Sequence, residues 1–219
     1  MPTTDAPTAR LEIISDVVCP WCYIGKHRLE QGLAMLDDDV SIEVSWRPFE
    51  LNPTLPKEGM DRGEYCEAKF GSIEQARQIY ANIAANAEVD GLPIAVERIA
   101  RTPNTRTAHR LIELAGTRGC QNELVDALFK AYFVDGRDVG DPETLLALSL
   151  AAGLSAPEAQ QTLADDSGDD AIETQERAAS AMGVHGVPAF IYNGRMLFSG
   201  AQSAQTIALT LKRAIAKGL

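Results

Sequence analysis

The chain has 219 residues, of which 45% are apolar and 23% are charged, the composition of an ordinary soluble globular protein. This length is enough for one large or two small domains with a sizeable core. The net charge of −11 argues against nucleic acid or an anionic membrane as a partner, because both are bound through basic patches. Much of the acidic excess lies in residues 37–39 and 165–170, which we interpret as solvated loops or helix ends.

Neither a membrane span nor a secretory signal is predicted. No segment reaches the roughly 18 uninterrupted apolar residues that a spanning helix requires. Residues 1–7 lack the basic and apolar regions of a secretory signal and are predicted to be a short disordered lead-in. On this basis we expect a cytoplasmic protein.

The first elements are predicted to be a strand, a helix and a second strand. Residues 11–18 form an apolar run typical of a buried strand, and residues 20–36 repeat apolar side chains at helical spacing. Residues 40–46 alternate apolar and polar side chains. This order predicts a parallel pair of strands with a right-handed crossover, after which Pro48, Pro53 and Pro56 end the regular structure.

Two cysteines lie where the first strand meets the helix, in the sequence Cys19-Pro20-Trp21-Cys22. A thiol at a helix N-terminus faces unpartnered backbone N–H groups and the positive end of the helix dipole, and both favour the thiolate. Pro20 suits the first helical turn, where its missing N–H costs nothing. We therefore expect Cys19 to be the nucleophile and Cys22 to be the thiol that resolves the mixed disulfide.

The remaining cysteines and histidines do not predict a metal site. Cys66 and Cys120 stand alone in helical patterns, and we interpret them as small buried residues. Zinc at the CxxC pair would need a second pair of ligands at a suitable spacing, and the sequence has none. We interpret the three histidines mainly as surface residues or as buried residues whose hydrogen bonds are satisfied. His109 and His185 are also candidates to line the site.

Residues 58–182 show almost only helical signals. Asn104-Thr105 can cap one helix, and Asp141-Pro142-Glu143 supplies an N-cap, a first-turn proline and an acid to another. Gly91 and Gly153 are predicted to end helices. Residues 165–170, rich in Gly and Asp, are a hinge candidate.

The last segment returns to strands. Residues 187–192 and 195–199 flank Asn193-Gly194, a strong signal for a two-residue hairpin turn. A final helix is predicted over residues 203–217. The sheet should therefore combine an early parallel pair with a late antiparallel hairpin.

Together these features resemble the thioredoxin fold in its DsbA-type form, and more narrowly the FrnE-like branch of DsbA oxidoreductases. The resemblance covers about residues 10–217 and is carried by four motifs: residues 15–26, 47–53 and 104–111, and Gly186-Val187-Pro188-Ala189-Phe190. It implies an α/β fold with a discontinuous thioredoxin-like domain, residues 10–55 and 183–219, and a helical insertion domain, residues 56–182. No cysteine follows Cys120, so the second redox pair of some FrnE-like proteins is absent.

The resemblance also implies a cis peptide bond before Pro188, facing the cysteines. Such a proline would leave the Val187 backbone free to pair with an extended substrate, as a strand would. Trp21 is expected to tune the redox pair and to cover the site. The residues expected to bind substrate are Pro20, Trp21, His185, Val187 and Pro188.

These expectations predict a thiol–disulfide oxidoreductase that acts on protein or small-molecule thiols and disulfides. It would need no cofactor beyond its own redox-active disulfide, with glutathione as a candidate co-substrate, and it could be a monomer or a homodimer. The direction of exchange stays open.

A rival hypothesis is a glutathione-dependent isomerase or transferase, of the 2-hydroxychromene-2-carboxylate isomerase or kappa type. Those relatives typically carry serine at the position of Cys19, and the kappa type tends to place an acid after the hairpin, where this chain has Ser199-Gly200-Ala201-Gln202. A redox-inert binding module is a third hypothesis, in which the cysteines would be incidental.

Overall fold

The computed structural model describes residues 9–37 and 40–219. The predictions for residues 1–7, and for Asp38 and Asp39 within the acidic run, lie outside the described residues. In the described part of the chain, no helix is both long and apolar enough to cross a membrane.

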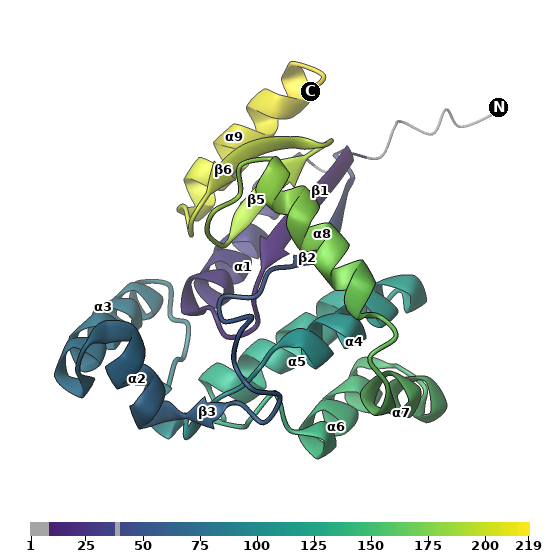
Figure 1. Cartoon of the computed structure of the whole chain (residues 1–219). Coiled ribbons are helices and arrows are strands. Elements are labelled where there is room, and N and C mark those ends of the chain that lie inside the picture. Colours follow the sequence, from purple (N-terminus) through teal and green to yellow (C-terminus); the bar gives the residue numbers. More distant parts are fainter. Residues whose placement is uncertain (1–8, 38–39) are drawn as a thin grey trace.

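A four-stranded mixed sheet forms the centre of the structure (Figure 1). Its strands are β1 (Ala9–Ser15), β2 (Ile42–Pro48), β5 (Ala189–Tyr192) and β6 (Arg195–Ser199), in the order β2-β1-β5-β6. β1 runs parallel to β2 and antiparallel to β5. β5 and β6 form the antiparallel hairpin that Asn193-Gly194 predicted, and both turn residues have positive φ.

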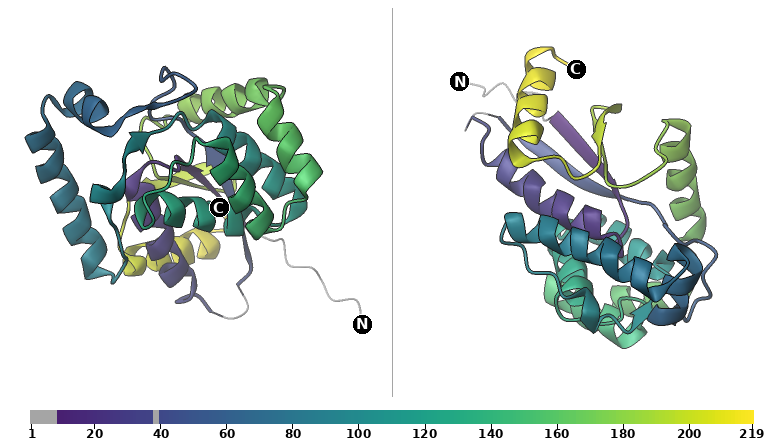
Figure 2. Two further views of the ribbon diagram at one scale, coloured as in Figure 1. Left: turned by 90° about the horizontal axis from the view of Figure 1, so that it is seen from below. Right: turned by 90° about the vertical axis from the view of Figure 1, so that its left-hand side faces the viewer.

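Helices cover the two faces of this sheet (Figure 2). α1 (Pro20–Leu33) and α9 (Ala204–Ala216) pack together beneath the face that carries Leu11 and Ile13. α8 (Asp169–Ala181) covers the opposite face, where Ile14 belongs to a separate apolar cluster. Successive side chains of a strand point to opposite faces of the sheet, so Ile13 and Ile14 lie in different apolar clusters. β1 is therefore buried on both faces.

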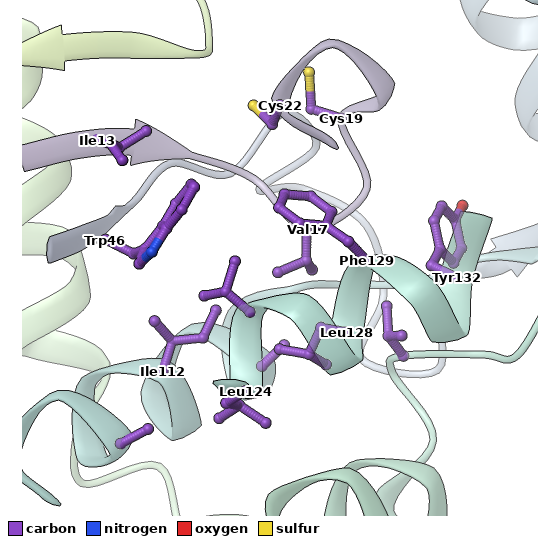
Figure 3. Packing of buried hydrophobic residues seen from close by; sticks show 14 of the residues in the cluster. Ile13, Val17, Cys19, Cys22, Trp46, Ile112, Leu124, Leu128, Phe129 and Tyr132 are labelled. Carbon is purple, nitrogen blue, oxygen red and sulfur yellow. The ribbon is translucent and has the colours of Figure 1, made fainter. Parts of the chain in front are cut away.

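The segment between β2 and α8 is mostly helical and supplies much of the apolar core. It contains α2 (Arg62–Phe70), α3 (Ile73–Val89), a 3₁₀ turn (Val96–Arg98), α4 (Arg106–Arg118), α5 (Gln121–Phe133), α6 (Pro142–Ala152) and α7 (Ala156–Ala164). α4 and α5 pack against β2. Figure 3 shows Phe129 and Leu128 of α5 pointing towards Trp46 and Val17, so the helical segment and the sheet share one core.

The predicted helix boundaries in this segment agree closely with the structure. Asp141 caps α6 by accepting a hydrogen bond from the Thr144 N–H at 2.8 Å, and Gly153 ends that helix in the left-handed region at φ 110°. The α/β class with a mostly helical segment between β2 and α8 is confirmed. The domain limits at residues 55–56 and 182–183 stay predictions.

Several boundaries differ from the sequence-based prediction, among them the start of β5, which begins at Ala189 and leaves residues 187–188 in the preceding loop. β1 ends at Ser15, not residue 18, because Asp16 turns the chain by accepting the Cys19 N–H at 3.0 Å. α1 ends at Leu33, not residue 36, and its last turn is closed by i→i+3 bonds such as Met35 N–H to Gly32. β2 begins at Ile42 and includes Pro48, which an edge strand tolerates.

The prediction also missed a short two-stranded sheet. β3 (Met60–Asp61) pairs antiparallel with β4 (Arg101–Thr102) inside the segment expected to be helical. Each strand has only two residues, too few for any periodicity to show in the sequence.

Two leucines of α9 test how much the α1–α9 layer contributes to stability. Leu211 is fully buried, whereas Leu209 on the same helix is 56% exposed. We expect Leu211→Ala to lower the free energy of unfolding by about 2–5 kcal/mol, because it leaves a cavity in the core. Leu209→Ala should change it by less than about 0.5 kcal/mol. Urea denaturation of both variants measures this, and equal losses would contradict the packing described.

Candidate active site

The two cysteines of the CPWC sequence lie at the end of β1, where the chain enters α1 (Figure 3). Cys19 is the N-cap of α1 with extended backbone (φ −87°, ψ 112°), and its carbonyl accepts the N–H groups of Cys22 and Tyr23. Pro20 is the first helical residue, as its sequence position predicted. Both thiols are free, so the structure shows the reduced state of the pair.

The thiol of Cys19 lies against the loop that precedes β5. Its Sγ is 3.7 Å from the carbonyl oxygen of Val187, 168 positions further along the chain. The Val187–Pro188 peptide bond is cis. The structure thus brings Cys19, Val187 and Pro188 together at one point, although only the first of them belongs to the CPWC motif.

The close approach of α1 to this loop requires a residue without a side chain. A Cβ atom added to Gly25, inside α1, would lie 2.9 Å from Cγ of Pro188, closer than real Cβ contacts allow. On its other side, the carbonyl of Pro188 accepts a hydrogen bond from the Gly200 N–H at 2.7 Å. The proline is therefore held between α1 and the segment that follows β6.

Cys22 is the more deeply placed of the two thiols. Its pKa is raised well above the ordinary value, chiefly because burial disfavours the thiolate, and then because of the neighbouring Cys19. The Ser15 hydroxyl and the Asp16 backbone act in the opposite direction but do not outweigh burial. Cys22 is consequently kept protonated in the reduced pair.

Of the other residues expected to bind substrate, Pro20 is half-buried, and Trp21 and His185 are exposed. Trp21 is 37% exposed, so its indole is only partly packed against the protein. His185 is exposed and lines a cavity of about 270 Å³ together with Val187, Met196 and Ser199. Val187, whose carbonyl faces Cys19, also lines this cavity, so His185 lies beside the loop that faces the thiol.

A buried carboxylate anchors the turn that carries Cys19. Asp16 is completely buried, and its Oδ2 accepts the Leu51 N–H at 2.7 Å while its Oδ1 lies 3.4 Å from the Val18 nitrogen. On the side of the helical segment, its Oδ1 is 3.5 Å from Nε2 of His109, which is itself buried. Among the described residues His109 Nε2 has no hydrogen-bond partner, so its contact with Asp16 is electrostatic and is a charge pair only when the imidazole is protonated.

His109 is surrounded by acids. Burial acts to lower the pKa of its imidazole, but the nearby carboxylates of Asp16, Glu50 and Glu176 outweigh it and raise the pKa above the ordinary value of 6.5. Glu50 is buried as well. Burial raises its pKa, and the adjacent Arg106 offsets only part of that shift.

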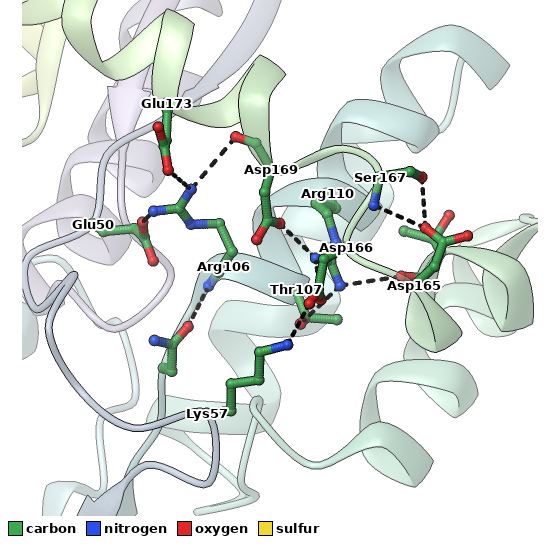
Figure 4. A network of polar contacts seen from close by, with 12 residues as sticks. Glu50, Lys57, Arg106, Thr107, Arg110, Asp165, Asp166, Ser167, Asp169 and Glu173 are labelled. Carbon is green, nitrogen blue, oxygen red and sulfur yellow. Dashed lines mark hydrogen bonds and ion pairs between the residues drawn. The ribbon is translucent and has the colours of Figure 1, made fainter.

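Glu50 belongs to a larger network of polar contacts that joins α4 to α8 (Figure 4). Arg106 contacts Glu50 at 2.6 Å and Glu173 at 3.5 Å. Arg110, one turn further along α4, is also buried and contacts Asp166 at 3.0 Å and Asp169 at 2.5 Å. Two of the acids interpreted from the sequence as a solvated run are therefore partners of a buried arginine.

The other candidate residues lie outside the CPWC turn. Cys66 is buried, as expected, whereas Cys120 is only half-buried at the N-cap of α5. His27 lies on α1 near the Asp90 carbonyl. In residues 9–37 and 40–219, no group of three or more His, Cys, Asp and Glu side chains is arranged to hold a metal ion.

Reasoning from the sequence assigned no role to Asp16, Glu50 or Arg106, although all three lie in the quoted motifs. The sequence did contain one indication that Asp16 has a role, because it is an acid between the apolar residues Ile14 and Val17. No comparable signal marks Glu50 and Arg106, because their pairing depends on how α4 packs beside the segment after β2.

Comparison with known proteins confirms the thioredoxin-like fold expected from the sequence. Residues 10–212 match the DSBA-like thioredoxin domain family. A crystal structure of a probable DsbA oxidoreductase from Streptomyces coelicolor is 37% identical with a TM-score of 0.85, covering 95% of this chain and 91% of that one.

Two more distant structures share the fold. A 2-hydroxychromene-2-carboxylate isomerase is 16% identical with a TM-score of 0.65, covering 95% of each chain. The cytosolic disulfide reductase DsbM of Pseudomonas aeruginosa, solved with GSH, is 15% identical with a TM-score of 0.61, covering 95% of this chain and 98% of that one. With the family match over most of its length, the chain belongs to the DsbA-like thioredoxin domain family.

Proposed function

We propose that this protein is a thiol–disulfide oxidoreductase that works through a mixed disulfide at Cys19. The observation that carries the proposal is the position of the Cys19 Sγ, at a helix N-terminus and 3.7 Å from the carbonyl of Val187. The helix end favours a thiolate, and the neighbouring loop offers backbone groups to an extended substrate. The family match supports this chemistry.

In the reducing direction the Cys19 thiolate attacks one sulfur of a substrate disulfide. The substrate S–S bond breaks, a Cys19–substrate disulfide forms, and the released substrate thiolate takes a proton. Cys22 then loses its proton, and its sulfur attacks Cys19 Sγ and releases the second substrate thiol. One substrate disulfide has become two thiols, and the Cys19–Cys22 pair has become a disulfide. The oxidising direction reverses each step.

The protonation of Cys22 divides the work between the two thiols. The raised pKa of Cys22 keeps it from competing as a nucleophile until the mixed disulfide has formed. The buried Cys22 sulfur then attacks Cys19, releases the substrate thiol and forms the Cys19–Cys22 disulfide. Burial of Cys22 thus explains why Cys19 reacts first and Cys22 second.

The substrate would dock as a short strand along the loop before β5. Within the described residues the Val187 N–H donates to no other group, and the adjacent cavity of about 270 Å³ has room for a side chain. Trp21 and His185 would border the bound chain. Because these contacts are mainly to backbone, the site should accept protein and small-molecule thiols alike.

The finer assignment to the FrnE-like branch is part of this proposal, as are a cytoplasmic location and glutathione as a thiol co-substrate. A neighbour with the same fold is described as a cytosolic disulfide reductase and was solved with GSH. In a glutathione-buffered compartment a strongly oxidising pair would rest in the dithiol form and favour reduction or isomerisation.

Replacing the nucleophile tests the proposal. Cys19→Ser should reduce catalysis of glutathione-dependent disulfide exchange on a model peptide to the uncatalysed rate, because a serine hydroxyl forms no disulfide. Cys120→Ser, the same substitution outside the site, is the matched control and should leave the rate unchanged. Exchange by Cys19→Ser at the parent rate would contradict the assignment. If Cys19→Ser instead isomerised 2-hydroxychromene-2-carboxylate in the presence of glutathione, the isomerase hypothesis would replace it.

Removing the resolving thiol should trap the intermediate. With Cys22→Ser the mixed disulfide at Cys19 can form but cannot be released from within, so oxidised glutathione should leave one glutathione attached per chain. Intact-mass spectrometry followed by peptide mapping measures its position. Glutathione on Cys66 or Cys120 in place of Cys19 would show that the roles are wrong.

A further inference from the structure

The motif that contains His109 has no part in the exchange steps above, yet its imidazole reaches the turn that carries the thiols. His109 belongs to α4 in the helical segment, and the carboxylate of Asp16, 3.5 Å away, belongs to the turn after β1. Both side chains are almost completely removed from water. A charge pair buried in this way acts on its neighbours more strongly than a surface pair would.

Asp16 is joined to the dithiol through its own backbone. Its carbonyl accepts the Cys19 N–H at 3.0 Å, and its backbone also acts on Cys22. Its carboxylate accepts a hydrogen bond from the Leu51 N–H at 2.7 Å. Asp16 therefore contacts the dithiol turn through its backbone and contacts Leu51 and His109 through its carboxylate.

We infer that Asp16 and His109 form a charge pair beneath the dithiol, through which the helical segment sets how strongly the reduced state of Cys19 and Cys22 is favoured. The inference rests on the proposed function, since it concerns the equilibrium of that pair. Asp16 and His109 are positioning residues that do not contact substrate. With His109 charged, the negative charge of Asp16 is balanced, and any thiolate in the reduced pair is stabilised. With His109 neutral, Asp16 opposes that thiolate.

Other charged groups around His109 decide when it is charged. Glu50, after β2, and Glu176 of α8 face it with Asp16, and Arg106 lies one turn away on α4. Glu176 also accepts the Glu50 N–H at 2.7 Å. The acids outnumber the nearby arginine, so the imidazole holds its proton to a higher pH than a free histidine. Its contribution is present at acidic pH and is lost as the pH rises through the raised pKa of His109.

The glutathione equilibrium of the Cys19–Cys22 pair, followed between about pH 5.5 and 8.5, tests the inference. At the acidic end His109→Gln should shift the equilibrium towards the disulfide by about tenfold, the effect of one nearby charge at intermediate dielectric. This difference should close as the pH rises. Asp16→Asn should shift the equilibrium the opposite way, towards the dithiol, at the alkaline end, where a neutral His109 no longer balances Asp16 in the wild type. In that background His109→Gln should add little, because without Asp16 the buried imidazole stays neutral. His27→Gln, the same substitution elsewhere, is the control and should match the wild type.

A measurement on the wild-type protein does not depend on how well the variants fold. If protonation of His109 changes the redox equilibrium, the redox state must change the proton affinity of His109 by the same factor. NMR titration of the His109 ring should therefore give different midpoints in the dithiol and disulfide forms. Equal midpoints, or a His109→Gln shift that is the same at every pH, would overturn the inference. Absence of any Cys19–Cys22 equilibrium with glutathione would instead reject the proposed function.

Discussion

The pairing of β1 with β5 is the contact on which the site depends. In this antiparallel pair Ile14 lies opposite Ala189, so the end of β1 and the beginning of β5 meet at the same edge of the sheet. The residues just beyond these two points are the turn to Cys19 and the loop that contains Val187 and Pro188. A shift of one residue would turn Ile14 from the α8 core to the opposite face, so burial on both faces holds the register.

The helical segment is part of the site as well as an insertion. Asp16 fastens the turn before Cys19 to Leu51, and His109 reaches the same carboxylate from α4. Buried charges of this kind rarely add stability, because the loss of hydration offsets their attraction. The inference that they act on the dithiol would account for their presence here. Arg106, which contacts both Glu50 and Glu173 of α8, joins the same group of charges to α8.

Local chemistry explains which features could be predicted from the sequence. The CPWC turn, the Asn193-Gly194 hairpin and the Asp141 cap each depend on residues within a few positions of one another, so their patterns are visible in the chain. The end of β1 at Ser15 could not be predicted, because an apolar run continues to Val18 and the turn depends on hydrogen bonds of a buried Asp16. An acid of this type usually indicates the surface. The Asp16–His109 pair joins residues from separate elements, and no spacing rule connects them.

The central claim is that Cys19 and Cys22 are a reversible redox pair. The most direct test is a titration of the wild-type protein with defined ratios of reduced to oxidised glutathione, with each species trapped by acid and counted by mass spectrometry. A single two-electron transition between the dithiol and a Cys19–Cys22 disulfide is predicted, in which the disulfide fraction depends on the square of the reduced glutathione concentration. A protein that stays a dithiol at every ratio, or forms disulfides that involve Cys66 or Cys120, would contradict the account.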